Sequence, residues 1–260
     1  MKKILVIDDS PIIRKIMHQY IQILGYECDQ AESGMQAMEQ VKNNDYVLIF
    51  TDIHMPQMDG FVTSKNIREI EDSLHKQHAP IIAITGTLLE EYTDKYKIYG
   101  INDCIRKPVE KSNILEILAK FVESKELRLS PTEPAETQSA NDNLIPINLK
   151  QVVSEFSGDR KMVVDILKEF LEISGEQIQQ IKQAVVKGDY QIVKNLSHSI
   201  KGGSANLCAP LLSAAAKDLE MMVISGHNED AKHLVNKLVR EHICLQDYYR
   251  KVICNENNDC

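Results

Sequence analysis

Short apolar runs that alternate with amphipathic stretches constrain the fold of the first half of the chain most strongly. Lys3–Ile7, Tyr46–Thr51 and Pro80–Thr85 are almost continuously apolar, which is typical of strands buried on both faces of a parallel sheet. Cys28–Ala31 and Asp103–Arg106 are weaker strand candidates. Because a helical pattern follows each of these five runs, the sequence predicts an α/β domain with a doubly wound, five-stranded parallel sheet.

The helical patterns carry their own end signals. Ser10 and Pro11 provide an N-cap and a first-turn proline, and Gly25 stops the helix that they begin. Apolar spacing predicts four more helices in this half, over residues 33–41, 61–74, 88–99 and 109–122.

The second half of the chain shows only helical periodicity. From Ile147 onward, successive apolar stripes are interrupted at Gly188 and Gly226, which predicts an all-α up-down bundle. One stripe contains Ile192, Leu196, Ile200 and Leu207, and the last three of these are assigned to the core side of the helix. Prolines and polar residues between the halves predict a linker over 125–143, separating a domain at 1–124 from a domain at 144–255.

Charge and composition narrow the kind of partner. The formal net charge is −8, which disfavours nucleic acid because a nucleic-acid partner requires a basic surface. The six cysteines are scattered, as expected for reduced thiols. The first apolar run is too short for a signal peptide, and no stretch has membrane-spanning length. We therefore expect a cytoplasmic protein that docks other proteins.

Chemically distinctive side chains stand where the predicted strands end. Asp8 and Asp9 close the first strand, Asp52 the third and Thr85 the fourth, and Lys107 follows the fifth. Carboxyl ends of parallel strands share one edge of the sheet, so these residues are expected to meet there. Clustered carboxylates repel unless a cation neutralises them, and oxygen ligands with phosphate chemistry favour Mg²⁺.

Such a cluster suits phosphoryl transfer to a carboxylate. Asp52 can act as the nucleophile, Lys107 and the metal can stabilise charge on the transferred group, and the Thr85 hydroxyl can contact it. Any one of these residues alone would be read as a solvated loop residue. Their coincidence at four strand ends favours a site.

These residues resemble the response-regulator receiver domain over 1–124. The resemblance rests on Val6–Ser10, on Asp52–Gly60 with its Asp-x-x-Met-Pro-x-Met-Asp-Gly pattern, on Ile84–Gly86 and on Arg106–Pro108. It implies a flavodoxin-like fold, with Asp52 as phosphoacceptor and Thr85 as its sensor. It further implies Mg²⁺ held by Asp8, Asp9, Asp52 and the backbone carbonyl of His54, and a receiver that catalyses its own Mg²⁺-dependent phosphorylation. A cis peptide bond before Pro108 is also implied.

One position departs from the receiver pattern. The family usually places an aromatic residue three positions before the lysine, and this chain has Cys104 there. A full aromatic switch is therefore not expected, which suits a receiver that passes phosphate on.

The second distinctive motif lies within the run Leu196–Ser204. His198 is followed by Lys201 at i+3 on the same helical face and by two glycines that leave space beside the ring. This His-x-x-Lys-Gly motif resembles the histidine phosphotransfer (HPt) domain over roughly 144–255. The resemblance implies a four-helix bundle with an added N-terminal helix, His198 as phosphoacceptor and Lys201 as its supporting cation. The other histidines lack a second supporting feature and are interpreted as surface residues.

The two motifs together predict a phosphorelay intermediate. Phosphate is expected to reach Asp52 from a phosphohistidine of a sensor or hybrid histidine kinase, and His198 is expected to exchange phosphate with a receiver aspartate. No glycine-rich ATP motif or kinase core is recognised, so whether the chain counts as an enzyme stays open. The alternatives are a docking module switched by phosphorylation and a phosphatase with an aspartate nucleophile.

Overall fold

A computed structural model describes residues 2–86, 93–122, 145–226 and 228–254. The chain forms two compact units, Met1–Ala135 and Glu136–Cys260, which are described separately below. The predicted linker at 125–143 lies outside the described residues. No helix in the described ranges is both long and apolar enough to cross a membrane.

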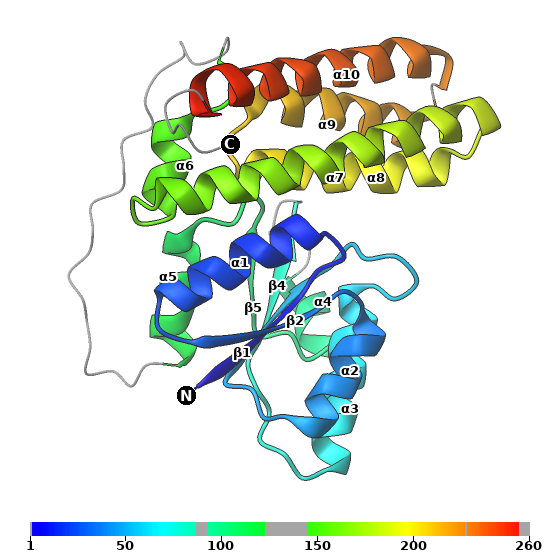
Figure 1. The fold of residues 1–260 in the computed structure, drawn as a ribbon. Helices are drawn as coiled ribbons and strands as arrows, with labels where there is room; N and C mark the ends of the chain where they lie inside the picture. The colour runs from blue at the N-terminus through cyan, green and yellow to red at the C-terminus, as the bar shows by residue number, and fades with distance from the viewer. Residues whose placement is uncertain (1, 87–92, 123–144, 227, 255–260) are drawn as a thin grey trace. The chain divides into compact units, whose positions relative to one another are not determined.

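The N-terminal unit contains the predicted parallel sheet. Its strands are β1 (Lys3–Ile7), β2 (Glu27–Ala31), β3 (Leu48–Asp52), β4 (Ile81–Thr85) and β5 (Asp103–Arg106). They lie in the order β2-β1-β3-β4-β5 with every pair parallel (Figure 1). All residues of β3 and β4 are buried, as their apolar runs require, whereas the edge strand β2 is mostly half-buried and carries polar residues. The fold class predicted from the sequence is confirmed.

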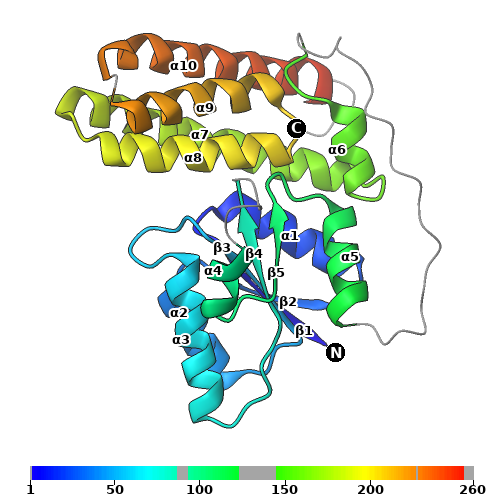
Figure 2. The same ribbon diagram turned by 180° about the vertical axis from the view of Figure 1, so that it is seen from behind.

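Helices cover both faces of this sheet. The helices are α1 (Pro11–Ile23), α2 (Gly34–Asn43), α3 (Gly60–Ser73), α4 (Thr93–Ile98) and α5 (Lys111–Phe121). Helix α1 packs against α5, and α2 packs against α3 on the opposite face (Figures 1 and 2). Ser10 caps α1 by accepting a hydrogen bond from the Ile13 amide, and Asp59 caps α3 in the same way through the Val62 amide. Only 93–98 of the helix predicted over 88–99 falls on described helical residues.

The regular elements among the described residues of the C-terminal unit are all helices. It comprises α6 (Leu149–Glu155), α7 (Arg160–Lys187), α8 (Tyr190–Asn206), α9 (Pro210–Ser225) and α10 (Ala231–Tyr248), which continues into the π-helix η3 (Tyr249–Cys254). A 3-10 turn, η2 (Asn228–Asp230), precedes α10. Helices α7 to α10 pack in a ring, each against the next and α10 against α7 (Figure 2). Gly188 and Gly226 end α7 and α9 with backbone φ angles of 73° and 75°, a left-handed conformation that favours glycine.

The predicted core face of α8 needs correction. Ile200 and Leu207 are buried as predicted, but Leu196 is only half-buried and Ile192 is 44% exposed. The buried residues of the helix include Val193, Ser197, Ile200 and Ser204. Two of these four are serines, so counting apolar residues alone displaced the predicted stripe around the helix. The Ser204 hydroxyl donates to the Ile200 carbonyl at 2.6 Å, which satisfies this polar group inside the bundle.

Candidate functional site

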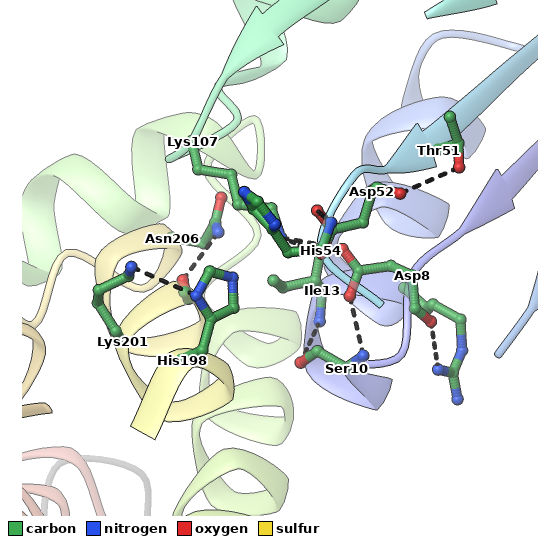
Figure 3. A network of polar contacts seen from close by, with 12 residues as sticks. Asp8, Ser10, Ile13, Thr51, Asp52, His54, Lys107, His198, Lys201 and Asn206 are labelled. Carbon is green, nitrogen blue, oxygen red and sulfur yellow. Dashed lines mark hydrogen bonds and ion pairs between the residues drawn. The ribbon is translucent and has the colours of Figure 1, made fainter. Parts of the chain in front are cut away.

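The first candidate site lies where strands β1, β3 and β4 end. Asp8 is fully buried and Asp52 is 1% exposed. Lys107, just after β5, places its Nζ 2.7 Å from Asp52 Oδ2 and 3.3 Å from Asp8 Oδ2 (Figure 3). Residues that are 99 positions apart in the sequence thus meet because parallel strands align their carboxyl ends.

Burial and charge compete at these three groups. Burial raises the pKa of Asp8 to about 7, with Lys107 opposing the rise and the neighbouring aspartates adding to it. Burial by itself lowers the pKa of Lys107, but Asp8 and Asp52 outweigh it and raise that pKa well above its usual range. Lys107 is therefore a firmly charged cation at physiological pH.

Backbone amides fix the orientation of both buried carboxylates. The Ser10 amide donates to Asp8 Oδ1 at 2.8 Å, and the His54 amide donates to Asp52 Oδ1 at 3.1 Å. In each case, one oxygen of the carboxylate faces the turn after its strand and the other contacts Lys107. Such hydrogen bonds hold each carboxylate in a single orientation.

The acidic residues are close enough to share a metal ion. One carboxylate oxygen from each of Asp8, Asp9 and Asp52 lies within 4.8 Å of the other two. Asp9 is half-buried, whereas the other two are buried, so the cluster opens toward solvent on the Asp9 side. An oxygen-only donor set of this kind suits a hard divalent cation.

The remaining predicted residues also gather at this end of the sheet. Thr85 is 1% exposed, and its carbonyl accepts a hydrogen bond from the Lys107 amide at 2.8 Å. The peptide bond between Lys107 and Pro108 is cis, as expected. Gly60 packs so closely against the backbone of Asp52 that a Cβ there would lie 2.2 Å from the Asp52 carbonyl oxygen. A side chain at this position would therefore displace Asp52.

Cys104 occupies the position where an aromatic residue is usual. It is half-buried on β5, opposite Ala83 in the strand register, and packs at the margin of the hydrophobic core. Burial raises the pKa of its thiol, so the sulfur stays protonated and behaves as a small apolar group.

The second candidate site lies on α8. Lys201 Nζ is 3.4 Å from His198 Nδ1, so the two predicted residues share one helical face (Figure 3). The His198 side chain is 19% exposed. Gly202 and Gly203 are buried, and the Ser213 hydroxyl of α9 donates to the Lys201 carbonyl at 3.2 Å. Helix α9 therefore approaches the α8 backbone beside the glycine pair.

A third residue of this site was missed in the sequence. Glu220, on α9, has one carboxylate oxygen 2.6 Å from His198 Nδ1 and the other 2.6 Å from Lys201 Nζ. Burial would raise the pKa of Glu220, but hydrogen bonds from His198 and Lys201 outweigh it and lower the pKa to about 2. The residue is 6% exposed and carries a charge, so it occupies a position that usually holds an apolar residue.

A sequence signal for Glu220 existed. Helices α8 and α9 are joined by a short turn centred on Cys208, so residues at similar distances from the turn face each other. His198 lies 10 positions before Cys208 and Glu220 lies 12 positions after it (208 − 198 and 220 − 208). A carboxylate at this offset, between the core residues Leu219 and Met222, marks a partner for the histidine.

Comparisons with known proteins identify a domain family in each half of the chain. Residues 4–119 match the response regulator receiver domain, and residues 165–251 match the Hpt domain. The sensor protein EvgS of Escherichia coli K12 is 27% identical over 256 residues, covering 98% of this chain and 20% of that protein. The signal transduction histidine-protein kinase BarA of the same strain is 21% identical over 227 residues, covering 87% of this chain and 24% of BarA.

The chain thus spans about a fifth to a quarter of the length of these two relatives. Among solved structures, the chemotaxis protein CheY4 of Vibrio cholerae is 27% identical, with a TM-score of 0.43, covering 47% of this chain and 99% of that one.

Proposed function

We propose that this two-component phosphorelay module, a receiver domain joined to an Hpt domain, carries phosphate on Asp52 and on His198. The observation that supports it most directly is the pairing of each acceptor with a cation: Lys107 lies 2.7 Å from Asp52, and Lys201 lies 3.4 Å from His198. Each cation offsets the negative charge that a phosphoryl group brings to its acceptor.

At Asp52 the proposed step is an in-line displacement. A carboxylate oxygen attacks the phosphorus of a donor phosphohistidine, a P–O bond forms, and the P–N bond breaks with its electron pair returning to the imidazole. Lys107 stabilises charge on the phosphoryl oxygens, and the Thr85 hydroxyl is assigned to contact one of them. The hydrogen bond from the His54 amide holds Asp52 in the orientation for attack.

The same cluster is proposed to bind Mg²⁺. Asp8, Asp9, Asp52 and the His54 backbone carbonyl would hold it, because the three carboxylates already converge within 4.8 Å. When bound, the ion supplies charge neutralisation for the carboxylates and for the transferred group. Asp8 would then hold its charge at neutral pH, despite the burial that raises its pKa.

At His198 the acceptor nitrogen is proposed to be Nε2. Glu220 engages Nδ1 at 2.6 Å, which favours the tautomer with its proton on Nδ1 and an electron pair on Nε2. Nε2 attacks the phosphorus of a receiver aspartyl phosphate, and the P–O bond breaks to release the carboxylate. Lys201 is then drawn from Glu220 toward the phosphoryl group, while Glu220 balances the charge on the imidazole.

Partners follow from this chemistry. The donor to Asp52 is proposed to be a phosphohistidine of a sensor histidine kinase, in keeping with the names of the relatives, and the partner of His198 a receiver domain. We propose that both phosphate exchanges take place in the cytoplasm. Domain limits of 1–124 and 144–255 are proposed for the two halves.

The test is phosphorylation of the intact chain by acetyl phosphate with Mg²⁺, followed by assays of how stable the label is in acid and in alkali. Alkali-labile label is expected on Asp52 and disappears in Asp52→Asn. Acid-labile label on His198 is expected after adding a phosphorylated receiver and disappears in His198→Gln. Asp45→Asn and His233→Gln remove exposed counterparts and should change neither label. If Asp52 is labelled but phosphate never passes between His198 and any receiver, the relay is wrong. A docking module that is switched by phosphorylation is then the better account of the chain.

A further inference from the structure

His242 of α10 is a buried histidine in the C-terminal unit. It is 8% exposed, and its Nε2 lies 3.1 Å from the Leu171 carbonyl oxygen and 3.0 Å from Ser174 Oγ, both on α7. The ring packs beside Gly175, where an added Cβ would lie 3.6 Å from the ring Cε1. The sequence predicts a surface position for this histidine, and the structure corrects that prediction because the side chain is buried.

Its hydrogen bonds define the proton on the ring. The Ser174 hydroxyl donates its hydrogen to the Phe170 carbonyl at 2.6 Å, so it presents a lone pair to His242. The Leu171 carbonyl is also an acceptor. Two acceptors at Nε2 require a proton there, and a neutral ring then has no proton on Nδ1. Among the described residues, the ring makes its hydrogen bonds through Nε2 and none through Nδ1.

No carboxylate among the described residues compensates a charge on this ring. On α10 itself, Glu241 pairs with Arg240, and on α9 Asp218 pairs with Lys237 at 2.6 Å. Two further acidic residues, Glu169 of α7 and Asp247 of α10, are half-buried. The other charged groups near these contacts on α7 and η3 are exposed; they are Lys168, Glu172, Glu176, Arg250 and Lys251. Burial lowers the pKa of His242, the Leu171 carbonyl partly opposes this, and no charged side chain contributes.

We propose that His242 is an acid-sensitive latch between α7 and α10, which weakens the histidine-bearing bundle when the ring takes up a second proton. Protonation places a cation in a buried contact that holds only a carbonyl and a hydroxyl. Because α10 also packs against α9, which carries Glu220, loosening α10 removes support from the His198 site.

The direction of the effect follows from proton linkage. The unfolded chain binds a proton at the ordinary histidine pKa of 6.5, whereas the folded chain binds it only at lower pH. Stability is therefore fully present above pH 6.5 and is lost as the pH falls toward the folded pKa. If the ring stays neutral in the fold, one such group lowers the folding equilibrium constant about tenfold at pH 5.5.

The experiment uses the intact chain and measures the unfolding of the C-terminal helical bundle only. Folded-state NMR amide signals of α10 are followed through urea titrations at pH 8.0, 7.0, 6.0 and 5.5, conditions chosen on either side of the histidine pKa. The wild-type chain is expected to lose up to about tenfold in folding constant across this range relative to His242→Gln. The glutamine amide can still donate to Leu171 and Ser174 but cannot be charged. His233→Gln, an exposed histidine on the same helix, should keep the wild-type pH dependence.

A ring measurement in the unmutated chain keeps the proposal testable if His242→Gln fails to fold. NMR titration of the His242 ring should show the Nε2–H tautomer and a midpoint below 6.5. A midpoint at or above 6.5, or equal pH dependence in wild type and His242→Gln, would overturn the latch. Neither readout involves phosphate, so failure here leaves the proposed relay standing, and failure of the relay leaves this result interpretable.

Discussion

The two candidate phosphoacceptor sites solve the same electrostatic problem in opposite ways. Asp52 is 1% exposed and is assembled from the ends of separate strands, so its neutralising cation, Lys107, comes from 55 residues away. The His198 side chain is 19% exposed and finds Lys201 one helical turn further on. A buried anionic nucleophile needs a firmly held cation before any phosphate arrives, whereas a neutral imidazole needs one only once it is phosphorylated.

The largest expected effect comes from removing the cation at the Asp52 site. Lys107→Met removes the cation 2.7 Å from Asp52 and replaces it with an uncharged, unbranched side chain that is one heavy atom shorter. We expect the rate of Asp52 phosphorylation by acetyl phosphate to fall about 10²-fold. The reason is that the phosphoryl group loses the preorganised positive charge that stabilises it during transfer. Labelling of His198 by a phosphorylated receiver should not change. An unchanged Asp52 rate would show that Lys107 has only a structural role.

A second prediction concerns metal and pH at the buried cluster. Without metal, the raised pKa of Asp8 lets the folded state keep a proton that the unfolded state loses above its ordinary pKa of 3.8. The stability of the N-terminal unit should therefore fall as the pH rises from about 4 to about 7. Mg²⁺ at a hundred times its dissociation constant should restore about 2.7 kcal/mol, read by urea unfolding at pH 7.5.

Asp8→Asn supplies the control for this effect. It should remove both the pH dependence of the N-terminal unit and most of its Mg²⁺ response, and the stability of the C-terminal unit should not change with Mg²⁺. Equal Mg²⁺ stabilisation in Asp8→Asn would place the ion elsewhere.

Glu220 offers a way to sharpen the second half of the comparison. Glu220→Ala removes the acceptor 2.6 Å from His198 Nδ1, and a hydrogen bond to a charged group is worth about 1.5 kcal/mol. We expect about a tenfold lower rate of transfer to His198. Glu220→Gln keeps an acceptor and should lose less. Identical rates in both variants and wild type would mean that His198 needs no partner on α9.

The smallest expected effect concerns Cys104. Cys104→Ala removes a half-buried thiol whose raised pKa keeps it neutral, so the rate of Asp52 phosphorylation should stay within about twofold and stability should fall by about 1 kcal/mol. Urea unfolding and acetyl phosphate labelling check the two values. A large change in the rate of Asp52 phosphorylation would show that position 104 influences Asp52 even though it carries no aromatic ring.

The comparison also explains which features the sequence revealed. Strand β1 has the predicted bounds, because an apolar run between polar residues fixes both ends of a buried strand. Strand β5 also has the predicted bounds, although Ile105 is its only buried residue. Strand ends then located Asp8, Asp52 and Lys107, since the topology of a parallel sheet determines where they meet. The predicted roles of these residues, and of Asp9, His54 and Thr85, stay predictions until the variants are made.

The missed residues share one physical cause. Glu220 and His242 are polar, and each is buried by a contact with a different helix, which helical periodicity within one segment does not report. The buried serines of α8 were missed for the same reason. Polar residues inside a bundle become visible only when facing positions on neighbouring helices are compared.

The contacts of Glu220 with His198 and Lys201 also make the His198 ring sensitive to the relative position of α8 and α9. The donor nitrogens and the accepting carboxylate stand on different helices, so any slide of α9 along α8 must change the environment of the imidazole. The nitrogen chemical shifts of that one ring therefore report helix spacing throughout a binding or unfolding experiment. An observer could follow the register of the bundle without attaching any probe to it.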